Sequence, residues 1–398
     1  MSDAVAIVRI AAKGDGVTAA GQHIRGGVPG DLILPDGTLQ HGPHHADPPC
    51  RHFSRCGGCQ LQHADEEALR RFVTDRVAHA AASQDIAVGE MLPTHLSPPL
   101  SRRRATLHGL KTAAGLVLGF REAGSHRIVD IVECHVLRPE LFALVQPLRE
   151  ALSKSAGKRP IDIAMTLVDQ GLDVSIAGVE LDGLGPTEAM LDFARDQRLA
   201  RLSLDQGFGP ESLWEPEPVT VTLSGIAVSL PPGAFLQPTL DGEHALVADA
   251  RGFAGDAGSV ADLFAGLGTF AFALSHRAKV LAVEAARDAH LACRSAASRP
   301  GGQVATLHRD LFRAPLQPEE LGRFDAVLLD PPRAGARDQV RELATSDVGR
   351  VIYISCNPSS WARDARTLID AGFRLATLRP VGQFCWSTHV ELTSLFVR

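Results

Sequence analysis

The sequence lacks several features that would assign it to a special class of protein. It has one tyrosine, three tryptophans, no run of 18 apolar residues and no charged-then-apolar start of the kind found in secretory signals. These absences argue against a membrane-spanning or secreted protein. The composition, 45% hydrophobic and 22% charged, is that of an ordinary globular protein. We therefore expect a cytoplasmic monomer with no membrane partner.

The chain also has no overall excess of positive charge. Its net charge of −6 argues weakly against a nucleic-acid partner, yet the stretch 97–138 holds seven Lys and Arg against three acids. Such a local excess can follow a phosphate backbone, or it can form a solvated basic face. The basic residues are Arg102, Arg103, Arg104, Lys111, Arg121, Arg127 and Arg138.

The length of 398 residues predicts two or three domains, because single cores rarely grow beyond about 250–300 residues. Residues 1–45 contain short apolar pairs separated by glycines and predict a small β module. Residues 46–92 combine clustered cysteines with a helical pattern over 64–82, and 93–235 predict a mixed α/β domain. Strands alternate with helices in 236–398, which predicts βαβ units and a parallel, Rossmann-like sheet. The expected fold class is α/β.

Polar residues follow the predicted strands of this last segment. In an open α/β sheet, ligands bind at the carboxyl ends of the strands. The turn Gly266-Leu267-Gly268 lacks the third glycine of a dinucleotide site, and no P-loop is present. A nucleoside without a pyrophosphate fits best, and S-adenosylmethionine is the common one; the alternative is that the acids merely cap helices. The strand-end residues are Asp262, Glu284, Asp310, Asp330 and Cys356.

Four of the seven cysteines lie in the first third of the chain. Cys50, Cys56 and Cys59 have the spacing C-x5-C-x2-C, and Cys134 follows 75 residues after Cys59. Four thiolates suit a [4Fe–4S] cluster or tetrahedral zinc, and one distant ligand favours iron–sulfur. Unligated core thiols remain the alternative.

Cys356 ends the apolar run Val351–Ile354 and precedes an Asn-Pro turn. A buried cysteine is usually a small hydrophobe, but the end of this strand coincides with the ligand-binding edge of the sheet. If the last segment, "HVELTSLFVR", forms an antiparallel strand, its first residues reach the same edge. Glu391 would then lie near Cys356 and Asp330, which pairs a thiol with a base.

The motifs "CGGCQLQH", "LGFREAGSHRIVDIVEC", "DLFAGLGTF", "LLDPPRAG", "YISCNP" and "HVELTSLF" occur in an order that resembles the RNA (uracil-5-)-methyltransferases, especially their iron–sulfur-containing 23S rRNA members. The resemblance covers the chain from about residue 48. It implies S-adenosylmethionine-dependent methylation of a uridine C5, with Cys356 as nucleophile and Glu391 as base. It further implies a truncated RNA-binding TRAM-like module at the N-terminus and an RNA-binding central domain. The implied cofactor residues are Gln237, Phe264, Thr269, Glu284, Asp310 and Asp330, and the implied [4Fe–4S] ligands are Cys50, Cys56, Cys59 and Cys134.

The chain departs from the family pattern at three positions: Thr239 replaces an asparagine, Gly382 an aspartate and Cys385 a proline. Two other functions stay open. One is a tRNA T-loop uracil-5-methyltransferase, whose bacterial forms usually lack the cysteines. The other is an iron–sulfur RNA-binding factor without methyltransferase activity. An N-methyltransferase is disfavoured, because Arg333 replaces the aromatic residue that its Pro-Pro motif needs.

Overall fold

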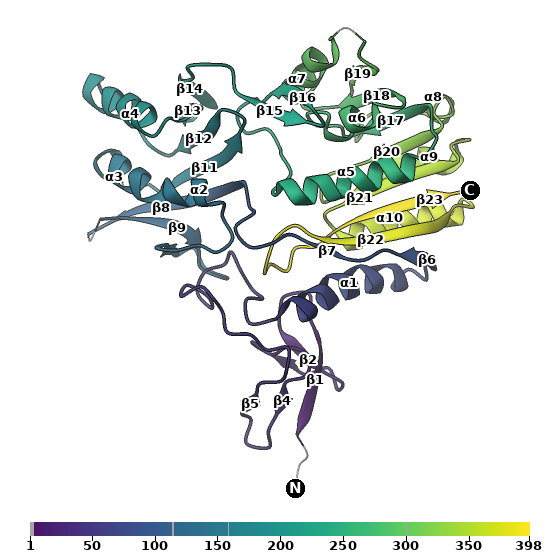
Figure 1. Ribbon diagram of the computed structural model, residues 1–398, viewed down its shortest axis with the longest axis horizontal. Coiled ribbons are helices and arrows are strands. Elements are labelled where there is room, and N and C mark those ends of the chain that lie inside the picture. Colours follow the sequence, from purple (N-terminus) through teal and green to yellow (C-terminus); the bar gives the residue numbers. More distant parts are fainter. Residues whose placement is uncertain (1–3, 114, 158, 300) are drawn as a thin grey trace.

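The computed structural model describes residues 4–113, 115–157, 159–299 and 301–398. A central lobe and a C-terminal lobe lie side by side, and a small N-terminal module sits below them in the view of Figure 1. Among the described residues, no helix is long and apolar enough to cross a membrane. The mixed α/β fold and the N-terminal β module agree with the expectation from the sequence.

The N-terminal module is a five-stranded antiparallel sheet with the order β3-β2-β1-β4-β5. Glycines punctuate it because its turns need positive φ values, as at Gly14 and Gly30. Its strands are β1 (Val5–Ile10), β2 (Gly16–Thr18), β3 (His23–Ile24), β4 (Leu32–Ile33) and β5 (Leu39–Gln40).

The central lobe is a seven-stranded sheet in which only β12 and β13 pair in parallel. Its strands are β8 (Arg104–Thr112), β9 (Gly115–Arg121), β10 (Ile128–Asp130), β11 (Ile161–Val168), β12 (Gly171–Ala177), β13 (Arg201–Asp205) and β14 (Pro210–Trp214). Helices α2 (Pro139–Ala143), α3 (Val145–Ser155) and α4 (Leu184–Asp196) complete it. A hairpin of β15 (Thr220–Leu223) and β16 (Ile226–Ser229) leads into the C-terminal lobe.

The C-terminal lobe contains a nine-stranded sheet of the doubly wound type. Its parallel strands are β17 (Ser259–Leu263), β18 (Lys279–Glu284), β19 (Val304–His308), β20 (Ala326–Leu329) and β21 (Arg350–Ser355). Strands β22 (Arg374–Gly382) and β23 (Glu391–Val397) follow, with β23 antiparallel to β21 as expected. The helices are α5 (Leu240–Ala254), α6 (Thr269–Leu274), α7 (Arg287–Ala297), α8 (Pro318–Leu321), α9 (Arg337–Thr345) and α10 (Pro358–Asp370).

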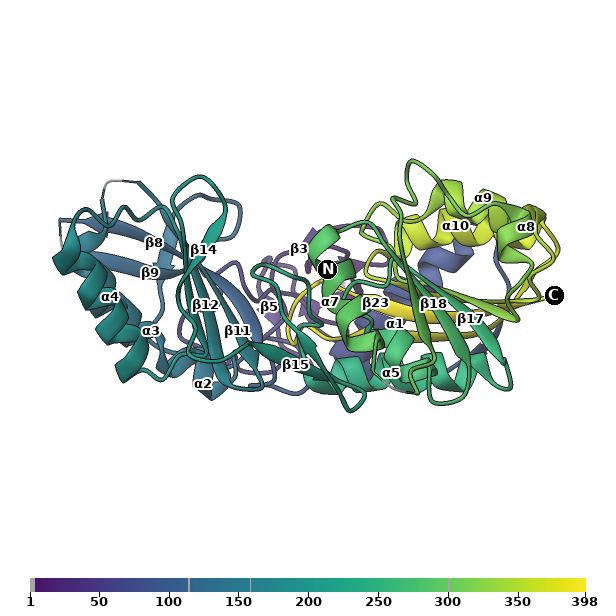
Figure 2. The same ribbon diagram turned by 90° about the horizontal axis from the view of Figure 1, so that it is seen from above.

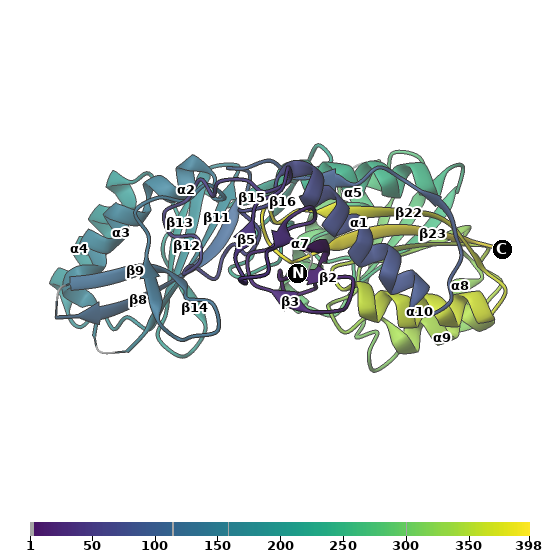
Figure 3. The ribbon, with the colours of Figure 1, turned by 90° about the horizontal axis from the view of Figure 1, so that it is seen from below.

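Part of this lobe comes from the beginning of the chain. Strands β6 (Val88–Met91) and β7 (His95–Leu96) pair with β22 and extend the sheet. Helix α1 (Glu66–Ala82) begins at the N-cap Asp65 and packs its apolar face, including Phe72 and Val77, against β22 and α10. Figure 3 shows α1 across this side of the lobe. The expected segment 46–92 is therefore not a separate unit, because α1 packs on the C-terminal sheet and β6 adds a strand to it.

Three arginines of the predicted basic stretch face inward and join the lobes. Arg103 donates from Nε to the carbonyl of Gln237 at 2.9 Å, and Arg104 donates to the carbonyl of Leu236 at 2.8 Å. The guanidinium of Arg102 lies 5.3 Å from the ring centroid of Phe384. These three guanidinium groups therefore make contacts within the protein: Arg103 and Arg104 hold the segment that leads into α5, and Arg102 lies against Phe384. This arrangement argues against phosphate contacts at these three positions.

Candidate active site

All eight predicted catalytic and cofactor residues line one cavity of about 800 Å³ at the carboxyl edge of the parallel strands. Strand ends and the turns after them supply the residues, because parallel strands bring these turns to one edge. The residues are Gln237, Phe264, Thr269, Glu284, Asp310, Asp330, Cys356 and Glu391.

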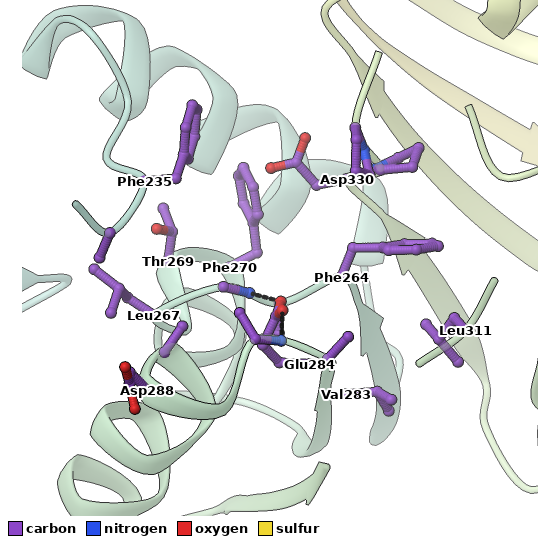
Figure 4. Close-up of a pocket in the computed structure, with 18 of the residues that line it drawn as sticks. Phe235, Phe264, Leu267, Thr269, Phe270, Val283, Glu284, Asp288, Leu311 and Asp330 are labelled. Atoms are coloured by element: carbon purple, nitrogen blue, oxygen red, sulfur yellow. Dashed lines mark hydrogen bonds between the residues drawn. The ribbon is translucent and has the colours of Figure 1, made fainter. Parts of the chain in front are cut away.

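The glycine turn between β17 and α6 forms one wall of the cavity. Phe264 adopts a φ of 65°, which a residue with a side chain rarely does, and Gly266 and Gly268 follow with φ values of 57° and 94°. Glu284 holds this turn, since its carboxylate accepts hydrogen bonds from the backbone N–H of Gly266 at 2.8 Å and of Ala286 at 2.6 Å (Figure 4). The carboxylate is thereby fixed at the cavity with lone pairs left over for hydroxyl groups.

Aromatic side chains lie on either side of this wall. The rings of Phe264 and Phe312 are 5.4 Å apart, and Phe312 is 47% exposed although it lies at the cavity. Asp310 accepts a hydrogen bond from the backbone N–H of Phe312 at 3.0 Å. Phe235, 62% exposed, lies beneath the guanidinium of Arg104 at 5.0 Å. In Figure 4 the Asp330 carboxyl extends toward the side that holds Phe235. Flat apolar walls beside carboxylates suit a nucleoside that carries a positive charge.

Cys356 stands between β21 and α10, where the strand gives way to a helix. Asn357 caps α10 by accepting from the N–H of Ser359, and its Nδ2 donates to the carbonyl of Arg333 at 2.9 Å. In the antiparallel pairing of β21 with β23, Ser355 lies opposite Leu392. Cys356 directly follows Ser355 and Glu391 directly precedes Leu392, so both reach the cavity from neighbouring strands although they are far apart in sequence.

Burial and nearby negative charge oppose ionisation of Cys356 and Glu391, which lie together at the catalytic end of the cavity. Burial raises the pKa of Glu391 to about 8, with a further contribution from the charge of Asp330. Burial raises the pKa of Cys356 to about 11; the charges of Glu391 and Asp330 add to this, and Arg333 opposes it. Burial also raises the pKa of Asp330 to about 7. A bound cation would offset the part of these shifts that comes from negative charge and so favour the thiolate.

A further carboxyl lies fully buried behind the glycine turn. Among the described residues, neither carboxyl oxygen of Asp262 has a hydrogen-bond partner, and burial, with the charge of Asp330, raises its pKa well above the usual range. The carboxyl therefore favours its neutral, protonated form in the free protein.

The four clustered cysteines line a second, smaller cavity between the N-terminal loop and the central lobe. All four are free thiols, and burial raises the pKa of Cys59 to about 12, with Cys134 and Cys56 adding to the shift. Among the described residues, no three His, Cys, Asp or Glu side chains form a group that could hold a metal ion as they stand. The thiols therefore surround a space rather than converge on one point. The four are Cys50, Cys56, Cys59 and Cys134.

The cysteine loop, residues 50–62, is bonded to the base loop, residues 383–389, which precedes Glu391. The N–H groups of Gln60 and Leu61 donate to the carbonyl of Trp386 at 2.8 and 2.9 Å. The Gln60 side chain accepts from the N–H of Thr388 at 3.3 Å. The loop just before the predicted base thus rests on the loop that carries three of the cysteines.

Two of the departures from the family pattern have structural reasons. Thr239 caps α5, since its hydroxyl accepts from the N–H of Gly242 at 3.2 Å. A Cβ at Gly382 would lie 2.7 Å from Cδ2 of Leu96, so the aspartate common at this position would require the Leu96 side chain to shift. The structure offers no account of Cys385, which is partly buried.

Sequence reasoning missed Gln383, which lies 1% exposed beside Glu391 and donates a hydrogen bond to its carboxylate. Its only signal was its position in the loop before "HVE", because a lone glutamine carries no charge pattern.

Comparison with known proteins places this geometry in a family. Residues 307–398, which include Cys356 and Glu391, match the model of the tRNA (uracil-5-)-methyltransferase family. A 23S rRNA (uracil(1939)-C(5))-methyltransferase of Pectobacterium atrosepticum is 34% identical over 90% of this chain and 82% of its own length.

The chain belongs to the RNA (uracil-5-)-methyltransferase family. Enzymes of this family are class I, S-adenosylmethionine-dependent methyltransferases. An RNA methyltransferase of Zymomonas mobilis, described as uncharacterized, is 50% identical over 98% of this chain and 99% of its own length. The tRNA (uracil-54, C5)-methyltransferase of Pyrococcus abyssi, solved with S-adenosyl-L-homocysteine, has the same fold, with a TM-score of 0.76 at 20% identity. That alignment covers 99% of this chain and 100% of the Pyrococcus protein.

Proposed function

We propose that the chain methylates C5 of one uridine in 23S rRNA, in the cytoplasm, with S-adenosylmethionine as methyl donor. The observation that carries this proposal is the presence of Cys356 and Glu391 in one cavity with the strand-end carboxylates. The 34% identical relative is described as acting on 23S rRNA, and the cysteine cluster favours the same target. A uridine in tRNA is the second candidate, because the matching family model is described by tRNA.

The cavity fits the methyl donor by its chemistry. Phe264 offers a flat apolar wall, Glu284 and Asp310 offer acceptors for hydroxyl and amino groups, and Thr269 begins α6 beside them. The carboxyl of Asp262 lies behind this wall with no hydrogen-bond partner among the described residues, whereas Asp330 lines the cavity; a bound cation would favour the ionised form of both. Gln237 lines the same cavity.

Cys356 performs covalent catalysis in this proposal. Its thiolate forms a bond from Sγ to C6 of the uracil, and the C5–C6 π electrons move into an enolate that ends on O4. S-adenosylmethionine, when bound, supplies the methyl group that C5 takes from the sulfonium. Glu391 then removes the C5 proton, the C5–C6 double bond re-forms and the thiolate leaves. Arg333 opposes negative charge at the catalytic end.

We propose that Cys50, Cys56, Cys59 and Cys134 hold a [4Fe–4S] cluster. Thiols spread around a cavity suit a multi-metal cluster better than one ion, and thiols kept protonated by burial become ligands when a metal offsets their charge. When bound, the cluster joins the cysteine loop to the central lobe at residue 134. The cluster takes no part in the methylation.

The central lobe and the TRAM-like N-terminal module are proposed to bind the RNA. Of the predicted basic stretch, Lys111, Arg121 and Arg127 are exposed and stay available to phosphates. The target base must leave its stack to enter the cavity, at a cost of a few kcal/mol.

The function is tested with RNA that contains 5-fluorouracil, whose C5 carries no removable proton. Incubation with S-adenosylmethionine should trap the protein covalently on the RNA, and Cys356→Ala should abolish the adduct. Cys293→Ala, which changes a buried cysteine outside the proposed chemistry, should still form it. An adduct that survives Cys356→Ala contradicts the nucleophile. Nucleoside mass spectrometry of 23S rRNA and tRNA from a deletion strain separates the two candidate substrates.

A further inference from the structure

The amide of Gln383 connects the proposed base to a second glutamine at the cavity. Its Nε2 donates to Oε1 of Gln237 at 3.0 Å and to Oε2 of Glu391. Its Oε1 is buried and has no hydrogen-bond partner within the part of the chain that the structure describes. An amide nitrogen has two N–H donors, so both are used by these contacts.

The contact with Glu391 fixes which way the Gln383 amide points. A carboxylate in the ionised form that a base needs can only accept hydrogen bonds, so it must face the nitrogen of Gln383 rather than its oxygen. The packing allows little movement, because a Cβ at Gly242 would lie 2.5 Å from Cγ of Gln383. Helix α5 therefore holds this side chain in place from behind.

The contact with Gln237 then fixes the second amide. Oε1 of Gln237 accepts from Gln383, and the opposite orientation would set two N–H donors against each other. Gln237 is 4% exposed and lines the cavity with Cys356 and Glu391. Among the described residues its Nε2 has no partner in the protein. The amide of Gln237 thus has N–H donors, and not an acceptor, left for a molecule bound in the cavity.

We propose that Gln383 is a positioning residue that sets the base specificity of the site by holding the Gln237 amide with its N–H donors toward the C4 position of the target base. This inference rests on the proposed function. Uracil has a carbonyl acceptor at C4, whereas cytosine has an amino donor there. A buried donor that meets another donor stays unpaired, which is the condition for strong rejection.

The same geometry serves the reaction. Addition of the Cys356 thiolate to C6 moves negative charge onto O4, so a fixed N–H donor at C4 binds the reacting ring more strongly than the resting one. Gln383 contacts neither the ring nor the cofactor in this arrangement. It acts through Gln237 and holds the Glu391 carboxylate.

The test compares RNA carrying the mapped target uridine with the same RNA carrying 4-thiouridine there, whose C4 sulfur is a weaker acceptor. The wild type should prefer uridine by kcat/KM at least about tenfold. Gln383→Met, which keeps the size and removes the donors, should bring this ratio toward one. Gln339→Met is the matched control, since Gln339 is an equally buried glutamine whose side chain, among the described residues, bonds only to the backbone of Leu316. It should leave the ratio unchanged.

A double variant shows whether Gln383 acts through Gln237. Gln237→Met should lower the ratio as Gln383→Met does, and the two changes together should lower it no further than Gln237→Met alone. A general loss of structure would reduce both rates and keep their ratio. The inference is overturned if Gln383→Met keeps the wild-type ratio or if the wild type shows no preference for uridine over 4-thiouridine. It is also overturned if the effects of Gln383→Met and Gln237→Met multiply in the double variant. If the wild type methylates neither RNA, the proposed function itself fails.

Discussion

At the scale of single residues, the catalytic end is electrostatically unfavourable in the free protein. Asp330 and Glu391 line one cavity, Asp262 is buried behind its glycine turn, and burial raises the pKa of each. Proteins commonly accept such a loss of stability where function needs it. The three carboxyl groups suit a cationic cofactor, and without it their burial lowers the free energy of unfolding.

This cost predicts a pH dependence of stability. The pKa of Glu391 is about 8 in the folded protein against a usual 4.5, so the folded state binds more protons than the unfolded state across that window. The free energy of unfolding should therefore fall as the pH rises from about 4.5 to 8. Glu391→Gln should remove part of this fall, on the order of 2 kcal/mol by pH 8.

Urea unfolding without S-adenosylmethionine, at several pH values, measures this effect. Glu320→Gln is a suitable control, because the pKa of Glu320 is lowered by its hydrogen bond to Arg309 and no gain at pH 8 is expected. An equal pH slope in the wild type and Glu391→Gln would contradict the burial argument.

Residues at strand ends could be predicted from the sequence, whereas residues that act through side-chain orientation could not. Glu284 and Cys356 follow apolar runs, and topology brings such ends together. Gln383 differs, because its role depends on which atoms of two amides face each other. Arg103 was misread for a related reason: the sequence records its charge but not that the guanidinium turns toward the carbonyl of Gln237.

At the scale of elements, the cysteine loop supports the base loop through backbone hydrogen bonds to Trp386. Arg102 strengthens this connection, since it lines the cysteine cavity and lies over the ring of Phe384. The order of the cysteine loop should therefore determine the order of the segment before Glu391. The spacing of the cysteines predicted a shared site but gave no sign of this contact.

Cluster binding is expected to depend on the four cavity cysteines. Protein purified without oxygen should contain iron and acid-labile sulfide, and Cys134→Ser should lose both. Cys385→Ser is the matched control: Cys385 is also partly buried and close enough to Cys59 to affect its pKa, yet it lies outside the cavity. Loss of iron should also make the base loop more sensitive to protease. Iron retained by Cys134→Ser, or lost by Cys385→Ser, would contradict the ligand set.

At the scale of the whole molecule, the C-terminal lobe is built from both ends of the chain. Without β6, β7 and α1, strand β22 would have an open edge and the apolar residues beneath α1 would be exposed. The strand–helix pattern of residues 236–398 predicted the parallel part of the sheet. It could not predict the added strands, because a short edge strand such as Val88–Met91 has no distinctive pattern.

A fragment of residues 236–398 should therefore fail to fold by itself. We expect it to aggregate or to lack a cooperative thermal transition by circular dichroism, while the full chain shows one. Supplying residues 46–100 in trans should recover soluble material. A monomeric 236–398 fragment that unfolds cooperatively would show that the N-terminal segment is dispensable for the fold.

The contact between Gln60 and Thr388 joins residues 328 positions apart. A ribosome that adds about 5–20 residues per second needs roughly 16–66 s to travel between them. All four cavity cysteines leave the ribosome before the base loop exists, so during synthesis the cysteine loop lacks this contact. Newly made chains thus pass through an interval in which the cysteine loop is present without the base loop that later bonds to it, before any active site is present.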